Sequence, residues 1–116
     1  MSKVKIYHNP RCSKSRATLV LLEEKGIKAD IILYLDQPPS PETLAEILDQ
    51  LGMKPRELLR KKESEYKLHQ LNDESLSDAQ LITTMCRFPR LIERPIVVNN
   101  GKAAIGRPPE KVLEIL

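Results

Sequence analysis

The stretch that decides the fold covers residues 4–35 and reads VKIYHNPRCSKSRATLVLLEEKGIKADIILYL. Alternating apolar and lysine residues at 4–6 predict a short strand. Residues 13–25 favour a helix, and Gly26 suits the left-handed position that closes a helix. Residues 29–35 are almost all apolar, which predicts a strand covered on both faces. This strand, helix and strand predict two parallel strands joined by a crossover helix.

Capping residues mark the helices that follow. Ser40 and Pro41 have the types preferred at an N-cap and at the first helical position, ahead of an amphipathic pattern that stops at Gly52. Ser77 and Gln80 match a capping box at the start of a later helix.

The last part of the chain predicts two more strands. Residues 96–98 and 103–105 are apolar and flank the Asn-Asn-Gly sequence at 99–101, which is typical of a hairpin turn. Apolar residues within 112–116 predict a closing helix. The complete order is that of an α/β protein, a thioredoxin-like fold with a helical insertion and a mixed four-stranded sheet.

The length of 116 residues predicts a single domain, residues 1–116, with the helical insertion at about 40–90. A net charge of +3, no Trp, one Phe and three Tyr argue against a nucleic-acid surface. The longest apolar run is residues 19–22, too short for a membrane span, and residues 1–6 do not resemble an export signal, so we expect a cytoplasmic protein.

Cys12 is the candidate nucleophile, since it stands between the first predicted strand and the first predicted helix. The N–H groups and dipole at a helix start stabilise a thiolate and lower its pKa. Arg11, Lys14 and Arg16 add positive charge nearby. Cys86 has a neighbouring Met85 and is interpreted as a core residue. The two cysteines lack the spacing of metal ligands, so no metal site is predicted.

The residue three positions after Cys12 is Ser15, so the chain lacks a Cys-x-x-Cys pair there. An adduct on Cys12 must therefore be resolved by an external thiol, or by Cys86 if the fold brings it near. His8 stands at the end of the first strand, where it either tunes the thiol or is simply a polar strand-end residue. His69 is interpreted as a surface residue.

Three arginines are candidate anion ligands. Arg60, Arg94 and Arg107 would form a cavity for a tetrahedral oxyanion if they surrounded one thiolate, because guanidinium groups bind such oxygens in a bidentate fork. Spacing does not show that they converge, and each alone could be a surface residue. In thioredoxin-like folds the proline at the position of Pro95 is cis and faces the redox cysteine.

These motifs extend over essentially the whole chain with their spacing intact. They are Ile6-Tyr7-His8-Asn9-Pro10 with the Cys12 that follows, Leu58-Leu59-Arg60-Lys61, Glu93-Arg94-Pro95-Ile96-Val97-Val98 and Gly106-Arg107-Pro108. Together they resemble the glutaredoxin-dependent arsenate reductase (ArsC) family, and in particular its short bacterial arsenate-reductase-like branch.

The resemblance implies that Cys12 attacks arsenate or a similar oxyanion, that Arg60, Arg94 and Arg107 bind the oxyanion, and that His8 helps to lower the thiol pKa. It implies no bound cofactor. Glutathione would be a co-substrate and glutaredoxin a protein partner, and together they would complete the reduction to arsenite.

Two other functions remain open. The related Spx-type regulators bind RNA polymerase and use a Cys-x-x-Cys switch, which Ser15 does not provide. A thiol enzyme acting on glutathione adducts is the other alternative. The chain also departs from well-known arsenate reductases around the cysteine, where Arg11, Ser13 and Lys14 replace small neutral residues.

Overall fold

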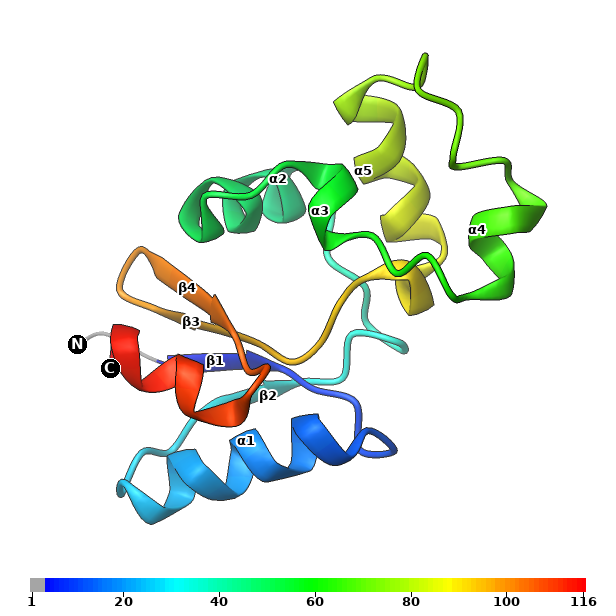
Figure 1. Cartoon of the computed structure of the whole chain (residues 1–116). Coiled ribbons are helices and arrows are strands. Elements are labelled where there is room, and N and C mark those ends of the chain that lie inside the picture. The colour runs from blue at the N-terminus through cyan, green and yellow to red at the C-terminus, as the bar shows by residue number, and fades with distance from the viewer. Residues whose placement is uncertain (1–3) are drawn as a thin grey trace. The chain divides into compact units, whose positions relative to one another are not determined.

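The computed structural model of the protein describes residues 4–116 (Figure 1). The chain forms two compact units. The first consists of the residues up to Gln37 together with Arg94–Leu116, and the second is Pro38–Glu93. The second unit is helical, and in the sequence it lies between the two parts of the first.

The first unit contains a mixed four-stranded sheet in the order β2-β1-β3-β4. Strand β1 (Val4–Tyr7) leads into helix α1 (Ser13–Glu24) and then into β2 (Asp30–Ile32), which lies parallel to β1. Strands β3 (Ile96–Asn99) and β4 (Lys102–Ile105) form an antiparallel hairpin, and β3 is antiparallel to β1. The predicted α/β thioredoxin-like fold, with its parallel crossover and mixed sheet, is confirmed.

The local signals in this unit are also confirmed. Asn100 and Gly101 have φ values of 52° and 80°, the left-handed conformation that a tight hairpin turn requires. Gly26 has φ 73° directly after the last residues of α1. The core lies between the sheet, α1 and the C-terminal 3-10 helix, and its buried centre is formed by Ile6, Leu22, Val97 and Val112.

Two sequence-based expectations for this unit are wrong. Strand β2 covers only Asp30–Ile32 and is not covered on both faces, because it lies at the edge of the sheet and Ile31 is 50% exposed. The closing helix is a 3-10 helix, η2 (Pro109–Ile115), which buries Val112 but leaves Leu113 exposed. At both places the apolar sequence therefore predicted more burial than the structure shows.

The second unit contains five short helical elements. They are α2 (Pro41–Leu51), α3 (Pro55–Leu58), α4 (Ser64–Leu68), α5 (Asp78–Arg87) and the 3-10 helix η1 (Pro89–Leu91). Helix α5 packs against α2, α3 and η1. The buried residues of these elements are mainly leucine, isoleucine and methionine: Leu44, Ile47, Leu48, Leu58, Leu81, Met85 and Leu91.

Both predicted helix caps are present in this unit. Ser40 Oγ accepts a hydrogen bond from the N–H of Thr43 at 3.2 Å. At the start of α5, Ser77 Oγ accepts from the N–H of Gln80 at 3.1 Å, while Gln80 Oε1 accepts from the N–H of Ser77 at 2.7 Å. These bonds satisfy N–H groups that the first helical turn leaves unpaired.

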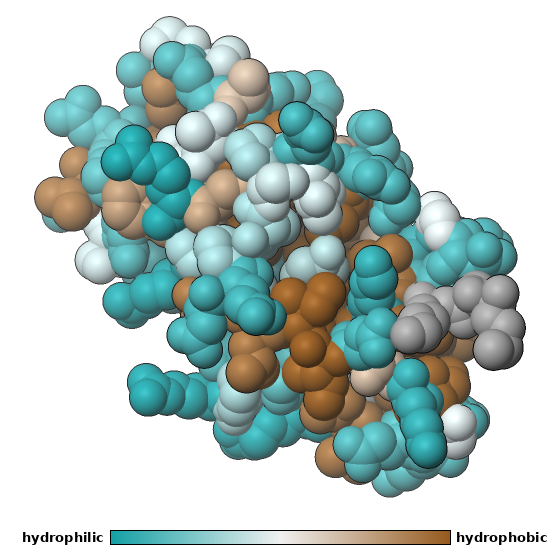
Figure 2. All heavy atoms as spheres, turned by 180° about the vertical axis from the view of Figure 1, so that it is seen from behind, coloured by the Kyte–Doolittle hydropathy of each residue, from teal (hydrophilic) through white to brown (hydrophobic). Residues whose placement is uncertain are grey.

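The face seen from behind in Figure 2 is mostly hydrophilic. Figure 2, the view from behind, also shows a group of hydrophobic residues at the surface with hydrophilic ones around it. In the part of the chain that the structure describes, no helix combines the length and apolar character needed to cross a membrane.

Candidate active site

A tight turn places Cys12 at the start of α1. The N–H of Cys12 donates to the carbonyl oxygen of Asn9 at 3.0 Å, which closes a four-residue turn with Pro10 at its second position. The side chain of Asn9 reinforces the turn, because its Oδ1 accepts from the N–H of Arg11 at 3.0 Å. Cys12 itself has extended backbone angles and is the N-cap residue of α1.

Ser15 ties this turn to the end of β1. Its side chain is completely buried, and its Oγ accepts a hydrogen bond from the N–H of Asn9 at 3.0 Å. The same oxygen lies 2.7 Å from Nδ1 of His8 and shares a hydrogen bond with it. Burial, followed by the charge of Arg16, lowers the pKa of His8, so the ring is neutral near pH 7. His8 is therefore connected to the turn through Ser15.

The Cys12 side chain is almost buried, at 8% exposure. Burial is the largest influence on the thiol and by itself raises its pKa. The N–H of Ser15, the guanidinium of Arg94 and the N–H of Lys14 act in the opposite direction, and together they bring the pKa of Cys12 below the ordinary value. The predicted thiolate at a helix start thus has a physical basis in this structure.

Two of the three predicted arginines lie at the sulfur. Arg94 interacts with the Cys12 thiolate through its side chain. Arg107 places Nη2 3.8 Å from Sγ of Cys12, and its Nε donates to the carbonyl oxygen of Arg94 at 2.9 Å. The Arg94–Pro95 bond is cis, as expected for the fold, and the Arg107–Pro108 bond is also cis.

Gly106 allows the segment between β4 and Arg107 to approach α1. A methyl group added at Gly106 would overlap Oγ1 of Thr18, and it would lie 2.9 Å from Cγ of Pro95. Thr18 is fully buried, and the N–H of Gly106 donates to the carbonyl oxygen of Pro95 at 3.0 Å. Only glycine fits this close approach without displacing its neighbours.

Arg60, the third predicted arginine, belongs to the second unit, where it is held by carboxylates. Its Nε lies 3.4 Å from Oε2 of Glu63, and its Nη1 lies 3.5 Å from Oε1 of Glu93. Glu63 also pairs with Arg90 at 3.2 Å. The Arg60 side chain is only 18% exposed, so its positive charge is largely neutralised inside this unit.

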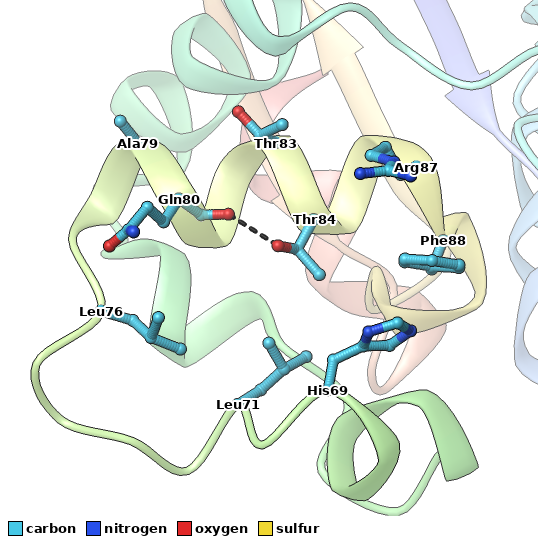
Figure 3. Close-up of a pocket in the computed structure, with 9 residues that line it drawn as sticks. All are labelled: His69, Leu71, Leu76, Ala79, Gln80, Thr83, Thr84, Arg87 and Phe88. Carbon is cyan, nitrogen blue, oxygen red and sulfur yellow. Dashed lines mark hydrogen bonds between the residues drawn. The ribbon is translucent and has the colours of Figure 1, made fainter.

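The second unit contains its own cavity, of about 480 Å³, between α5 and the segment before it (Figure 3). His69 lines this cavity, is exposed as predicted, and stacks on Phe88 with ring centroids 4.3 Å apart.

Cys86, in α5, is only partly buried, so it is less buried than the core residue that the sequence suggested. Burial raises the pKa of its thiol. Both cysteines are free thiols. Within residues 4–116, no three His, Cys, Asp or Glu side chains form a group that could hold a metal ion.

Known proteins resemble this chain over nearly its whole length. The model of the ArsC family matches residues 7–115. This chain belongs to the ArsC family. The ArsC-family protein is 58% identical over 115 residues to the uncharacterized protein YfgD of Escherichia coli K12, covering 98% of this chain and 97% of YfgD.

Several relatives carry the name arsenate reductase. The one from Haemophilus influenzae is 52% identical to this ArsC-family protein over 112 residues, covering 96% of this chain and 97% of the relative. The solved structure of an arsenate reductase from Vibrio cholerae superposes with a TM-score of 0.96 at 55% identity, covering 98% of each chain. The likeness extends over nearly the whole length of both relatives.

The structure brings His8, Cys12, Arg94 and Arg107 together in the first unit of the ArsC-family protein. Sequence reasoning missed the role of Ser15, which it treated only as the absence of a second cysteine. A serine at this position is fully buried and bonds to both sides of the turn. Its position in the first turn of the predicted helix, close to the strand-ending His8, was the available signal.

Proposed function

We propose that this protein is an arsenate reductase in which the Cys12 thiolate attacks arsenate and external thiols complete the reduction. The observation that carries the proposal is the single low-pKa thiol with Arg94 and Arg107 beside it. Guanidinium groups offset the charge of an oxyanion, so that an anionic nucleophile can approach it. The arsenate reductases among the relatives add support.

In the proposed cycle, the Cys12 sulfur forms a bond to arsenic and an arsenate oxygen leaves as water, with arsenic still As(V). A glutathione thiol replaces a second oxygen, which also leaves as water. A glutaredoxin thiolate then attacks the glutathione sulfur. The electron pair of the sulfur–arsenic bond stays on arsenic, which becomes As(III), while a disulfide forms between glutathione and glutaredoxin. Water releases arsenite from Cys12.

The arginines and His8 have distinct roles in this proposal. Arg94 and Arg107 hold the oxyanion at the sulfur, and Arg60 supplies a third guanidinium by resemblance to the family. His8 acts as a positioning residue, because it is neutral and contacts Ser15, whose N–H stabilises the thiolate. The protein itself needs no bound cofactor, since the electrons come from the external thiols.

The test is an arsenate-dependent NADPH oxidation assay containing glutathione, glutaredoxin and glutathione reductase. The wild type should turn over arsenate, and the Cys12→Ser variant should be inactive. Cys86→Ser is the matched control and should keep its activity, because burial raises the pKa of that thiol. Equal rates for wild type and Cys12→Ser would refute the proposal. Turnover of a glutathionylated peptide without arsenate turnover would favour the glutathione-adduct alternative.

A further inference from the structure

A cavity of about 310 Å³ borders the turn that leads to Cys12. One wall is the loop His8–Arg11, and the other is formed by Leu33, Leu35 and Asp36 after the end of β2. Sites for small ligands span roughly 300–1,000 Å³, so this cavity is large enough for one small molecule. Both walls belong to the first unit.

Hydrogen bonds hold both walls in place. The N–H of His8 donates to the carbonyl oxygen of Ile32 at 2.9 Å and joins the loop to the end of β2. Beyond β2, the carbonyl oxygen of Leu33 accepts from the N–H groups of Asp36 at 3.0 Å and Gln37 at 2.8 Å. The backbone of the cavity is therefore preformed, which reduces the ordering cost of binding a ligand.

The side chains on the walls favour a ligand with charges of both signs. Arg11 is exposed on one wall and Asp36 on the other, so a cation and an anion are available at the same cavity. Leu33 and Leu35 are 38% and 37% exposed and provide an apolar surface near these charges. A small zwitterionic peptide with an apolar middle part matches this pattern.

The position of the cavity indicates what such a peptide would do. Arg11 immediately precedes Cys12, and the turn that forms one wall ends with the hydrogen bond from Cys12 to Asn9. Ser15 stands where a second cysteine would otherwise resolve an adduct, so the proposed reaction requires a thiol from outside the protein. A ligand held at this wall is adjacent in the chain to the nucleophile.

We propose that this cavity is the binding site of the external thiol, the γ-glutamyl tripeptide glutathione. Arg11 pairs with a carboxylate of the tripeptide, Asp36 with its α-ammonium group, and the two leucines contact its methylene groups. This assignment rests on the proposed function. The bound thiol forms a bond to the arsenic carried by Cys12, and a hydroxyl of that arsenic leaves with the thiol proton as water.

The test uses S-methylglutathione, which binds like glutathione but has no thiol to react. Titrated into the ¹⁵N-labelled protein, it should shift the amide signals of residues 8–11 and 33–36 in a saturable way. Arg11→Ala and Asp36→Asn should each weaken binding about fivefold, as expected for exposed charge-assisted contacts. Lys25→Ala, at the far end of α1, is the charge-matched control and should bind like the wild type.

A second ligand sharpens the test. S-methylcysteinylglycine lacks the γ-glutamyl group, so it should bind more weakly and should not respond to Asp36→Asn. Absence of saturable shifts, shifts in another region, or equal affinity for wild type and Arg11→Ala would each overturn the assignment.

Kinetics separate the two proposals. Arsenate turnover with an unchanged KM for glutathione in Arg11→Ala overturns the cavity assignment but leaves the proposed function intact. Saturable binding at the cavity without any arsenate turnover refutes the proposed function and supports the site as a peptide-binding cavity.

Discussion

Replacing Gly106 with alanine tests whether the close approach of β4 and α1 positions the site. The new methyl group would overlap Oγ1 of Thr18 and lie 3.2 Å from its Cγ2. Thr18 is completely buried, and its hydroxyl donates to the carbonyl oxygen of Lys14 at 2.8 Å, so it has little room to move. We therefore expect the strand end to be displaced, together with the adjacent Arg107.

The expected loss of stability follows from overpacking. Inserting a methylene-sized group into a well-packed core costs about 1–3 kcal/mol. With a urea m-value of about 1–3 kcal/mol per molar for a small protein, the midpoint of urea unfolding should fall by about 1 M. Urea titration followed by far-UV circular dichroism measures this shift. The iodoacetamide reactivity of Cys12 against pH reports on the site in the same variant.

Second-site variants distinguish this overlap from other causes. Thr18→Ala removes two of the three atoms that the new methyl group meets and leaves only Cγ of Pro95, so the double variant should lose at least about 1 kcal/mol less than the sum of the single losses. Thr18→Val keeps the bulk and removes only the hydroxyl, so it should give no such relief. A stable Gly106→Ala protein, or strictly additive losses with Thr18→Ala, would refute the reasoning.

Three further predictions concern charged and titrating groups. Arg94→Gln should raise the pKa of Cys12, because it removes a guanidinium whose hydrogen bond and charge lower that pKa. It should also increase the KM for arsenate about tenfold or more; thiol alkylation measures the pKa and the coupled assay measures the KM. The pKa of His8 is lower in the folded protein than in the unfolded chain. The free energy of unfolding should therefore keep its full value above about pH 6.5 and fall by up to about 1.4 kcal/mol per pH unit below it. His8→Asn should remove this dependence, as measured by urea titrations at several pH values. Under the proposal that Arg60 also binds arsenate, Glu63→Gln should lower the KM for arsenate about threefold in the coupled assay, because one carboxylate no longer competes for Arg60.

The His8 and Glu63 predictions each have a matched control. His69→Asn should keep the pH dependence of stability, because His69 is exposed on the surface. Glu65→Gln should leave the KM for arsenate unchanged, because Glu65 pairs with Arg90 at 3.8 Å. A thiol pKa in Arg94→Gln equal to that of the wild type, or a KM that rises in Glu63→Gln, would contradict the corresponding prediction.

Much of the fold followed from interactions between residues close in sequence. The Ser77–Gln80 capping box, the left-handed Asn100 and the N-cap at Ser40 each depend on a few neighbouring residues, so their types alone predict them. The strand before Cys12 and the helix after it were predicted for the same reason. The apolar run at residues 29–35 gave the wrong prediction of a strand covered on both faces, because an edge strand and a covered strand can have the same composition.

The sequence by itself therefore determined the kind of residue proposed as the nucleophile: a single cysteine at a helix start with no second thiol close to it in the sequence. Tertiary structure alone decided its surroundings. Arg107 reaches Cys12 because the sheet order places β3 beside β1 and β4 beside β3, and residues 95 positions apart have no local pattern that could reveal this contact. The link between His8 and Ser15 and the fit of Gly106 against Thr18 likewise depend on side chains that meet only after folding.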